Sequence, residues 1–210
     1  MHAQRRKTRK ATEPNRAERT ADEASVRIIG GQFRGRKLLY SGDTRTRPMK
    51  DRVREALFNL IGPDVKGMHA IDLFAGTGAL GLESVSRGAA RATLIERHFP
   101  TAELIRRNVK ALGAEDRCRV AAADALNWLK RNAPPADLPW LVLCSPPFEL
   151  YESQRGPIEA LIGDFVTQAP IASIIVVETP DTFDLGTLPQ ADRWQSRTYA
   201  PVVLAIYRKV

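Results

Sequence analysis

Hydrophobic and polar positions along the chain predict an alternation of strands and helices from residue 68 onward. Short apolar runs indicate strands, and apolar residues spaced three or four positions apart indicate helices. The predicted strands are 68–74, 91–96, 119–122, 140–144, 171–177, 194–199 and 202–207. The predicted helices are 80–87, 100–112, 125–129 and 158–165. This order predicts an α/β fold with a mostly parallel sheet and an antiparallel hairpin at its carboxyl-terminal edge.

The first part of the chain follows a different pattern. Its beginning is polar with almost no apolar residues, which predicts a disordered basic tail. Two short β-like runs around Val26 and Leu38 frame a glycine-rich stretch and predict a hairpin. An apolar stripe at helical spacing then predicts a helix that ends at Gly62. The expected parts are a tail (1–24), a hairpin-and-helix extension (25–62) and an α/β domain (63–210).

Positive charge is concentrated in the amino-terminal quarter. The chain has 32 Lys and Arg against 24 Asp and Glu, a formal net charge of +8. Residues 1–54 hold 16 of these basic and 6 of these acidic residues, so the remainder is nearly neutral. A basic segment on a neutral body indicates a polyanionic partner, most often a nucleic acid. The expected RNA-contacting residues are Arg27, Arg34, Arg36, Lys37, Arg47 and Lys50.

The basic residues of the predicted helix and the two cysteines can each be explained without a functional role. Lys50, Arg52 and Arg54 lie off the apolar stripe of the predicted helix, so they form either a solvated face or an RNA-facing surface. Cys118 and Cys144 are far apart with no metal-ligand spacing, which favours buried thiols in a reducing cytoplasm. No metal site is expected. No apolar run is long enough to span a bilayer, so no membrane association is expected.

A glycine-rich turn after the first strand of the α/β domain is the candidate cofactor site. Gly76, Gly78 and Gly81 follow that strand and open a helix, a spacing that also fits the dinucleotide pattern G-x-G-x-x-G. Asp72 at the strand end distinguishes between ligands, because a carboxylate there repels a pyrophosphate and suits a cation. S-adenosylmethionine (SAM) has a sulfonium, an amino group and no phosphate. The pattern favours SAM, with a nicotinamide-dependent oxidoreductase as an alternative.

Acidic residues fall at or just after the ends of three successive strands. Besides Asp72, these are Glu96 and Asp124. Glu96 lies 20 residues past Gly76, where an acid can accept both ribose hydroxyls of an adenosine. Asp124 is suited either to an adenine amino group or to capping the helix that follows it. Together the three acids predict a site for an adenosine-containing ligand without phosphates.

The tetrapeptide Ser145-Pro-Pro-Phe148 is the second candidate motif. Two prolines after a buried strand hold a stiff extended turn. The Ser145 hydroxyl and the Pro146 carbonyl can accept hydrogen bonds, and Phe148 can stack on a planar base. Two such acceptors can orient the lone pair of an exocyclic amine toward a methyl group. The motif therefore predicts methylation of a base amine, with the base flipped or unpaired.

These motifs resemble known families. Residues 72–83, 86–89 and 145–148 resemble the class I SAM-dependent methyltransferases. Residues 27–36, 47–48 and 51–59 resemble the bacterial family that methylates guanine N2 in 16S ribosomal RNA. The resemblance implies a Rossmann-like seven-stranded sheet, SAM as donor, and 16S rRNA or the assembling small subunit as partner of a cytoplasmic monomer. The cofactor-binding positions implied are Asp72, Phe74, Ala75, Gly76, Thr77, Gly78, Glu96 and Asp124; the catalytic positions implied are Ser145, Pro146 and Phe148.

Ser145 departs from the family pattern, which usually has Asp or Asn at this position. Serine is shorter and uncharged, so it accepts a weaker hydrogen bond than a carboxylate does. A Ser-Pro-Pro motif also resembles that of DNA cytosine-N4 methyltransferases, where it usually precedes the glycine loop. The alternatives are therefore a methyltransferase-like rRNA-binding protein with weak or lost activity, and a methyltransferase acting on another nucleic-acid amino group.

Overall fold

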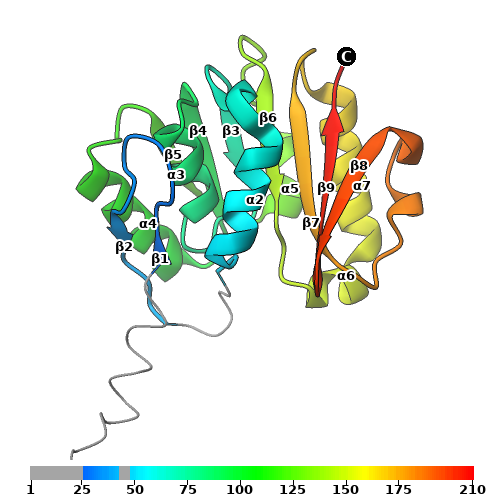
Figure 1. The fold of residues 1–210 in the computed structure, drawn as a ribbon, viewed down its shortest axis with the longest axis horizontal. Helices are drawn as coiled ribbons and strands as arrows, with labels where there is room; N and C mark the ends of the chain where they lie inside the picture. Colours follow the sequence, from blue (N-terminus) through cyan, green and yellow to red (C-terminus); the bar gives the residue numbers. More distant parts are fainter. Residues whose placement is uncertain (1–25, 43–47) are drawn as a thin grey trace, which may run out of the picture.

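The structure, a computed structural model, describes residues 26–42 and 48–210 (Figure 1). Across these residues the centre is a seven-stranded sheet, whose strands are β3 (His69–Asp72), β4 (Arg91–Glu96), β5 (Cys118–Ala122), β6 (Trp140–Cys144), β7 (Ile174–Pro180), β8 (Trp194–Tyr199) and β9 (Val202–Arg208). Six strands run in one direction, and β9, next to the edge strand β8, runs antiparallel to them. The α/β architecture predicted from the sequence is confirmed. The tail expected over 1–24 lies outside the described residues.

The strand order places the two candidate motifs together. The order across the sheet is β5-β4-β3-β6-β7-β9-β8, so the direction of winding reverses between β3 and β6. A reversal of this kind opens a crevice at the carboxyl ends of the strands, where α/β proteins bind their ligands. Asp72 at the end of β3 pairs with Leu143 in β6. The glycine loop and Ser145 therefore leave the sheet side by side.

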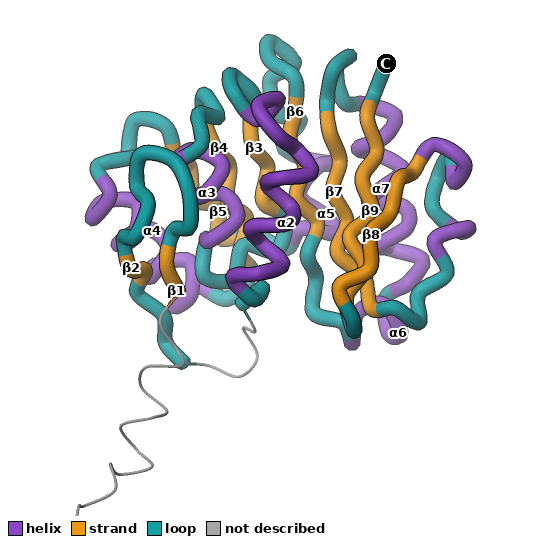
Figure 2. Tube along the Cα trace, in the orientation of Figure 1, coloured by secondary structure: helices purple, strands orange, loops and turns teal. Residues whose placement is uncertain are grey.

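Helices cover both faces of this sheet (Figure 2). On β6, Leu141 and Leu143 join one core cluster, whereas Val142 and Cys144 join the other, because successive side chains of a strand point to opposite faces. The first cluster packs against α2, α3 and α4, and the second against α5, α6 and α7. The helices are α2 (Asp51–Ile61), α3 (Ala79–Ser86), α4 (Phe99–Leu112), α5 (Ala125–Arg131), α6 (Glu149–Ser153) and α7 (Arg155–Gln168).

Several helix ends lie where the sequence predicts them. Gly62 and Gly113 follow α2 and α4 with φ of 66° and 63°, a backbone conformation that glycine adopts without strain. Pro100 lies in the first turn of α4, where its missing N–H costs no helical hydrogen bond. These signals confirm the predicted ends of α2 and α4. α6 was not predicted, because it has only five residues and directly follows the proline turn.

The amino-terminal hairpin is bonded to the helices of the α/β domain. Its strands are β1 (Val26–Arg27) and β2 (Lys37–Leu38), which pair antiparallel as predicted. The buried carboxylate of Glu83 in α3 accepts hydrogen bonds from the backbone N–H groups of Ile29 and Gly30, both at 2.7 Å. Asn108 in α4 bonds both the N–H and the carbonyl oxygen of Leu39. The extension therefore shares one core with the sheet.

Arg54 in α2 is fully buried, so the expectation that it lies on a solvated or RNA-facing surface is wrong. Its guanidinium donates to the carbonyl oxygen of Arg27 and to the carboxylate of Asp51. Its Nε lies 3.9 Å from the buried carboxylate of Glu83. The helical pattern of α2 alone could not show this burial, because the hairpin and α3 cover that side of the helix.

β7 begins and ends later than the apolar run 171–177 predicts. Ile171 is 73% exposed, and the turn at Ala172, with φ of 66°, delays the strand until Ile174. At its other end the strand continues because β9 pairs with it, and Leu204 lies opposite Glu178. The additional residues at the end of β7 place Glu178 beside the end of β6.

Candidate active site

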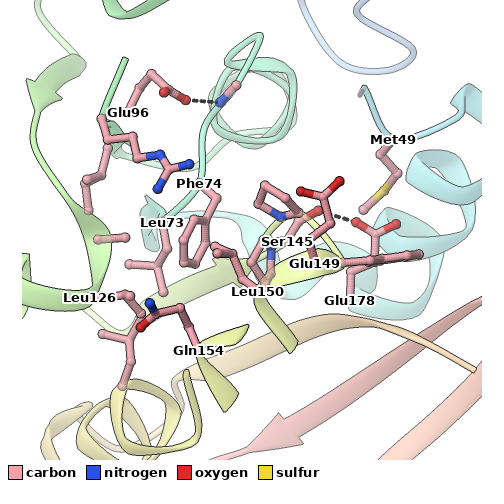
Figure 3. A pocket seen from close by; sticks show the side chains of 18 of the residues that line it. Met49, Leu73, Phe74, Glu96, Leu126, Ser145, Glu149, Leu150, Gln154 and Glu178 are labelled. Carbon is pink, nitrogen blue, oxygen red and sulfur yellow. Dashed lines mark hydrogen bonds between the residues drawn. The ribbon is translucent and has the colours of Figure 1, made fainter. Parts of the chain in front are cut away.

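A cavity of about 1290 Å³ lies at the carboxyl ends of the parallel strands (Figure 3). It exceeds the ~300–1,000 Å³ that a single drug-sized ligand usually occupies, so it can hold a cofactor and a second planar ligand. Figure 3 shows Glu96 and Leu126 toward one end, Ser145, Glu178 and Met49 toward the other, and Phe74 between them.

Two of the predicted acids lie at the first end of the cavity. Glu96 ends β4, and its carboxylate accepts hydrogen bonds from Gly76 N at 2.9 Å and His98 N at 2.7 Å. Asp124 accepts from Leu126 N at 3.1 Å, so it is the N-cap of α5. Both side chains also line the cavity. The two interpretations of Asp124 are therefore compatible, because a carboxylate has more acceptor sites than its cap bond uses.

Asp72, in contrast, is buried behind the cavity. Its side chain is 1% exposed, and its Oδ2 accepts a hydrogen bond from Gly81 N at 2.9 Å. Its Oδ1 is buried without a hydrogen-bond partner among the residues that the structure describes. Burial raises the pKa of Asp72 to about 7, against the opposing effect of the Gly81 hydrogen bond. An orphaned carboxylate oxygen beside the glycine loop fits a cationic or donating ligand group.

The glycines of the loop serve two different purposes. Gly76 lines the cavity. A Cβ at Gly78 would meet Ile105 Cγ2 at 3.0 Å, and one at Gly81 would meet Leu94 Cδ2 at 2.8 Å. Gly78 and Gly81 therefore permit close packing of the start of α3 against β4 and α4, and the role of Gly78 at the cofactor stays a prediction. Of the implied cofactor positions, those lining the cavity are Phe74, Gly76, Glu96 and Asp124, and those buried behind it are Asp72, Ala75, Thr77 and Gly78.

The Ser-Pro-Pro-Phe turn forms the second end of the cavity. Ser145, Pro146 and Phe148 all line it. The Ser145 hydroxyl donates a short hydrogen bond to the carboxylate of Glu178, which Figure 3 marks. Glu178 is 8% exposed and comes from the neighbouring strand β7. Glu178 was not predicted as a site residue, although an acid directly after an apolar run is a signal comparable to Asp72.

Cys144, next to Ser145, is not a nucleophile. Its thiol is buried in β6, and burial raises its pKa to about 12. The thiol is therefore protonated at neutral pH, and a protonated thiol is a poor nucleophile. The arrangement supports direct transfer between two bound ligands rather than a covalent enzyme intermediate.

The expected RNA-contacting residues lie in two places. Lys50 lines the cavity and is exposed. Arg27, Arg34, Arg36 and Lys37 are exposed on the hairpin; Arg27 pairs with Asp51, and Arg36 donates to the carbonyl oxygen of Ala111. Arg47 lies outside the described residues. Arg52, which the sequence left as either solvated or RNA-facing, also lines the cavity, and so do Arg97 and Lys130, which were not predicted.

Two further properties limit the chemistry of the described residues. Within 26–42 and 48–210, no group of three or more His, Cys, Asp or Glu side chains could hold a metal ion. Over the same ranges, none of the helices has the length and apolar character needed to cross a membrane.

The strand order, the glycine loop after β3, the acid that ends β4 and the Ser-Pro-Pro-Phe turn after β6 define a class I SAM-dependent methyltransferase. Comparison with known proteins agrees. The family model described as "Conserved hypothetical protein 95" matches residues 26–208. Ribosomal RNA small subunit methyltransferase D of Escherichia coli is 39% identical over 166 residues, which cover 78% of this chain and 79% of that protein.

Solved structures show the same fold. The Escherichia coli protein yhhF, described as a methyltransferase, superposes with a TM-score of 0.74 at 34% identity, covering 89% of this chain and 98% of that one. The Thermus thermophilus 16S rRNA N2 G1207 methyltransferase, in complex with AdoMet and guanosine, has a TM-score of 0.67 over 89% of this chain and 50% of that one. At 18% identity this second likeness shows the fold alone.

The chain belongs to the family of ribosomal RNA small subunit methyltransferase D. It is a SAM-dependent methyltransferase, and the oxidoreductase alternative suggested by the glycine spacing is wrong.

Proposed function

We propose that this protein transfers the methyl group of SAM to the exocyclic N2 amine of a guanine in 16S rRNA. The observation that carries the proposal is one cavity that joins Glu96 and the glycine loop to the Ser145–Pro146 turn. The names of the relatives, which are small-subunit rRNA methyltransferases, support the substrate class. The fold neighbour that was solved with AdoMet and guanosine supports the pairing of ligands.

The first end of the cavity suits SAM, which supplies an electrophilic methyl group on its sulfonium. The Glu96 carboxylate is placed to accept hydrogen bonds from the ribose hydroxyls, as acids at this position do in dinucleotide sites. Ile95 and Leu126 give apolar walls for the adenine. Asp72, buried behind this end, holds the glycine loop in shape through its bond to Gly81 N. Phe74 separates this end from the Ser-Pro-Pro-Phe turn.

The second end suits a guanine that has left its helix. Phe148 offers an aromatic face for stacking, and the Ser145 hydroxyl and the Pro146 carbonyl offer two acceptors for the two amine hydrogens. Acceptors on both hydrogens hold the nitrogen lone pair toward the methyl carbon. In the transfer the N–C bond forms, the C–S bond breaks with its electron pair moving to sulfur, and the amine gives up a proton. Orientation supplies most of the acceleration.

Basic side chains around the cavity suit the phosphates that flank a flipped nucleotide. Lys50, Arg52, Arg97 and Lys130 line the cavity and are exposed, and they come from α2, the loop after β4 and α5. Each phosphate contact by such a side chain adds affinity that falls with rising salt. The hairpin arginines extend the basic surface toward α4 and complete our proposed RNA-binding extension, residues 25–62.

Three finer features follow from this proposal. RNA in an assembling small subunit can present an unpaired guanine more readily than RNA in a completed helix can. We therefore propose the assembling subunit as the physiological substrate. A reaction on 16S rRNA places the enzyme in the cytoplasm. We also propose that the protein acts as a monomer.

The test is methyl transfer from labelled SAM to small-subunit rRNA, offered as naked RNA and as partly assembled subunits. Digestion of the product to nucleosides identifies the labelled base. The proposal expects N2-methylguanine, with more label on assembling subunits than on naked RNA. Label on another nucleoside, or none on either substrate while SAM binds in calorimetry, would overturn it.

A further inference from the structure

The proposed reaction leaves one chemical problem at Ser145. The amine must lose a proton during transfer, and a neutral serine hydroxyl is a poor proton acceptor. It also accepts hydrogen bonds more weakly than the carboxylate or amide usual at this position. The residues packed around Ser145 therefore decide whether the turn can do this chemistry.

The sheet register puts a carboxylate directly beside Ser145. Cys144, the last residue of β6, pairs with Val177 in the parallel strand β7. The next residues along the two strands, Ser145 and Glu178, are therefore neighbours at the edge of the cavity. The Ser145 hydroxyl is hydrogen-bonded to the Glu178 carboxylate, and both side chains line the cavity (Figure 3).

Glu178 is held in this position by two further elements. Its carbonyl oxygen accepts a hydrogen bond from the buried Tyr151 hydroxyl of α6 at 2.7 Å. On the other side Glu178 pairs with Leu204 in β9. The backbone that carries the carboxylate is therefore fixed by α6, β6 and β9 together. A fixed geometry is what a proton transfer needs, because donor and acceptor must stay within hydrogen-bond reach.

We infer that Glu178 is a positioning residue that acts through Ser145 and supplies the negative charge that the serine lacks. In the ground state the hydroxyl donates its proton toward Glu178, which polarises the Ser145 oxygen and strengthens it as an acceptor for the amine. During transfer the amine proton moves to the Ser145 oxygen as the Ser145 proton moves to the Glu178 carboxylate. The serine ends unchanged, and the glutamic acid then returns its proton to water.

The arrangement accounts for a carboxylate that is otherwise costly. A carboxylate 8% exposed pays a large desolvation penalty unless it is hydrogen-bonded. One hydrogen bond of the Glu178 carboxylate comes from the Ser145 hydroxyl at the cavity wall. The inference rests on the proposed function, because it assigns the route of the proton in that same reaction.

The test compares Glu178→Gln with wild type in single-turnover methyl transfer to the rRNA substrate. Glutamine keeps the shape and can still accept from Ser145, but it cannot take the proton. We expect the rate constant to fall by about 100-fold or more, the scale of general acid–base catalysis. SAM affinity by calorimetry should stay unchanged, because Glu178 lies at the other end of the cavity from Glu96. The matched control is Glu115→Gln, an exposed acid just before β5, which should react at the wild-type rate.

A second substitution separates this role from a structural one. Ser145→Asp introduced into Glu178→Gln puts a carboxylate directly at the amine, so we expect it to restore much of the lost rate. In the wild-type background the same substitution sets two carboxylates side by side, where like charges oppose each other's ionisation. There we expect no gain.

The outcomes distinguish the two proposals. A wild-type rate for Glu178→Gln, or no rescue by Ser145→Asp in that background, overturns the role of Glu178 while leaving the methyltransferase assignment intact. No methyl transfer by the wild-type protein instead overturns the proposed function.

Discussion

The backbone N–H of Gly81 in α3 donates a 2.9 Å hydrogen bond to Oδ2 of Asp72 at the end of β3. The bond ties the first turn of the helix to the strand and so fixes the glycine loop that runs between them. Because it uses only one carboxylate oxygen, the other stays buried without a partner among the described residues. The same acid therefore shapes the loop and has a second oxygen that no described group bonds.

The burial of Asp72 predicts a pH-dependent stability. Burial raises its pKa from 3.8 to about 7, so between about pH 4 and 7 the folded protein binds a proton that the unfolded chain has released. This group therefore makes the ligand-free protein less stable as pH rises through that range. His69 acts in the opposite direction, because burial lowers its pKa to about 4.

Asp72→Asn isolates the effect, because both proteins keep His69. Thermal melting without SAM at pH 5 and pH 8 is the measurement. The melting temperature of wild type minus that of Asp72→Asn should be lower at pH 8 than at pH 5. A difference that stays constant with pH would show that Asp72 does not titrate in this range.

Gly81 predicts a packing penalty. A Cβ there would meet Leu94 Cδ2 at 2.8 Å, so Gly81→Ala should lower the free energy of unfolding by about 1–3 kcal/mol, as overpacked cores do. Gly156→Ala is the matched control, since nothing described lies within 4 Å of its added Cβ and the site is helical. It should be neutral or stabilising by about 0.5–1 kcal/mol. Urea denaturation of both variants measures this, and equal effects would refute the packing argument.

The buried contacts of Glu83 predict a large loss of stability when its charge is removed. Glu83→Gln leaves the buried guanidinium of Arg54 without a full counter-charge and weakens the bonds from Ile29 and Gly30. Removing one partner of a buried ionic pair costs about 3–5 kcal/mol. Glu103→Gln breaks an exposed pair with Arg106 and should cost about 0–1 kcal/mol. Chemical denaturation separates the two, and a small loss for Glu83→Gln would mean that the hairpin is held mainly by apolar contacts and its other hydrogen bonds, such as those of Asn108.

Lys130 predicts a contribution to RNA binding. Lys130→Gln should weaken binding of rRNA and lower the slope of log affinity against log salt by about 1, the effect of one lost phosphate contact. Lys66→Gln, an exposed lysine that precedes the amino end of β3 and so lies at the opposite end of the strands from the cavity, should leave the slope unchanged. Filter binding at several salt concentrations measures the slope. Equal slopes for all three proteins would place the RNA elsewhere.

The sequence predicts the order of elements and both motif loops, because hydrophobic periodicity and glycine or proline punctuation are local properties. It misses Glu178 because the end of β7 is set by pairing with β9, a contact between distant parts of the chain. It misplaces Arg54 for a similar reason, since the hairpin and α3 bury it. Patterns within one element cannot show what another element covers.

In the candidate site, too, some positions could be predicted from the local sequence and others depend on contacts with distant elements. Glu96 and Ser145 follow strands, and parallel strands end at one edge, so their convergence could be predicted. The packing role of Gly78 could not be predicted, because a glycine that admits a ligand and one that admits a neighbouring helix look alike in sequence. The position of Ile105 shows that a side chain at residue 78 would press on α4.

The most direct test of the central claim uses an rRNA fragment in which inosine replaces the guanosine that the wild-type protein methylates. Inosine lacks only the exocyclic amine that Ser145 and Pro146 are proposed to hold. With labelled SAM, the account predicts label on the guanosine fragment and none on the inosine fragment, although both RNAs bind. Equal labelling of the two fragments would contradict it, because the methyl group would then go to an atom other than N2.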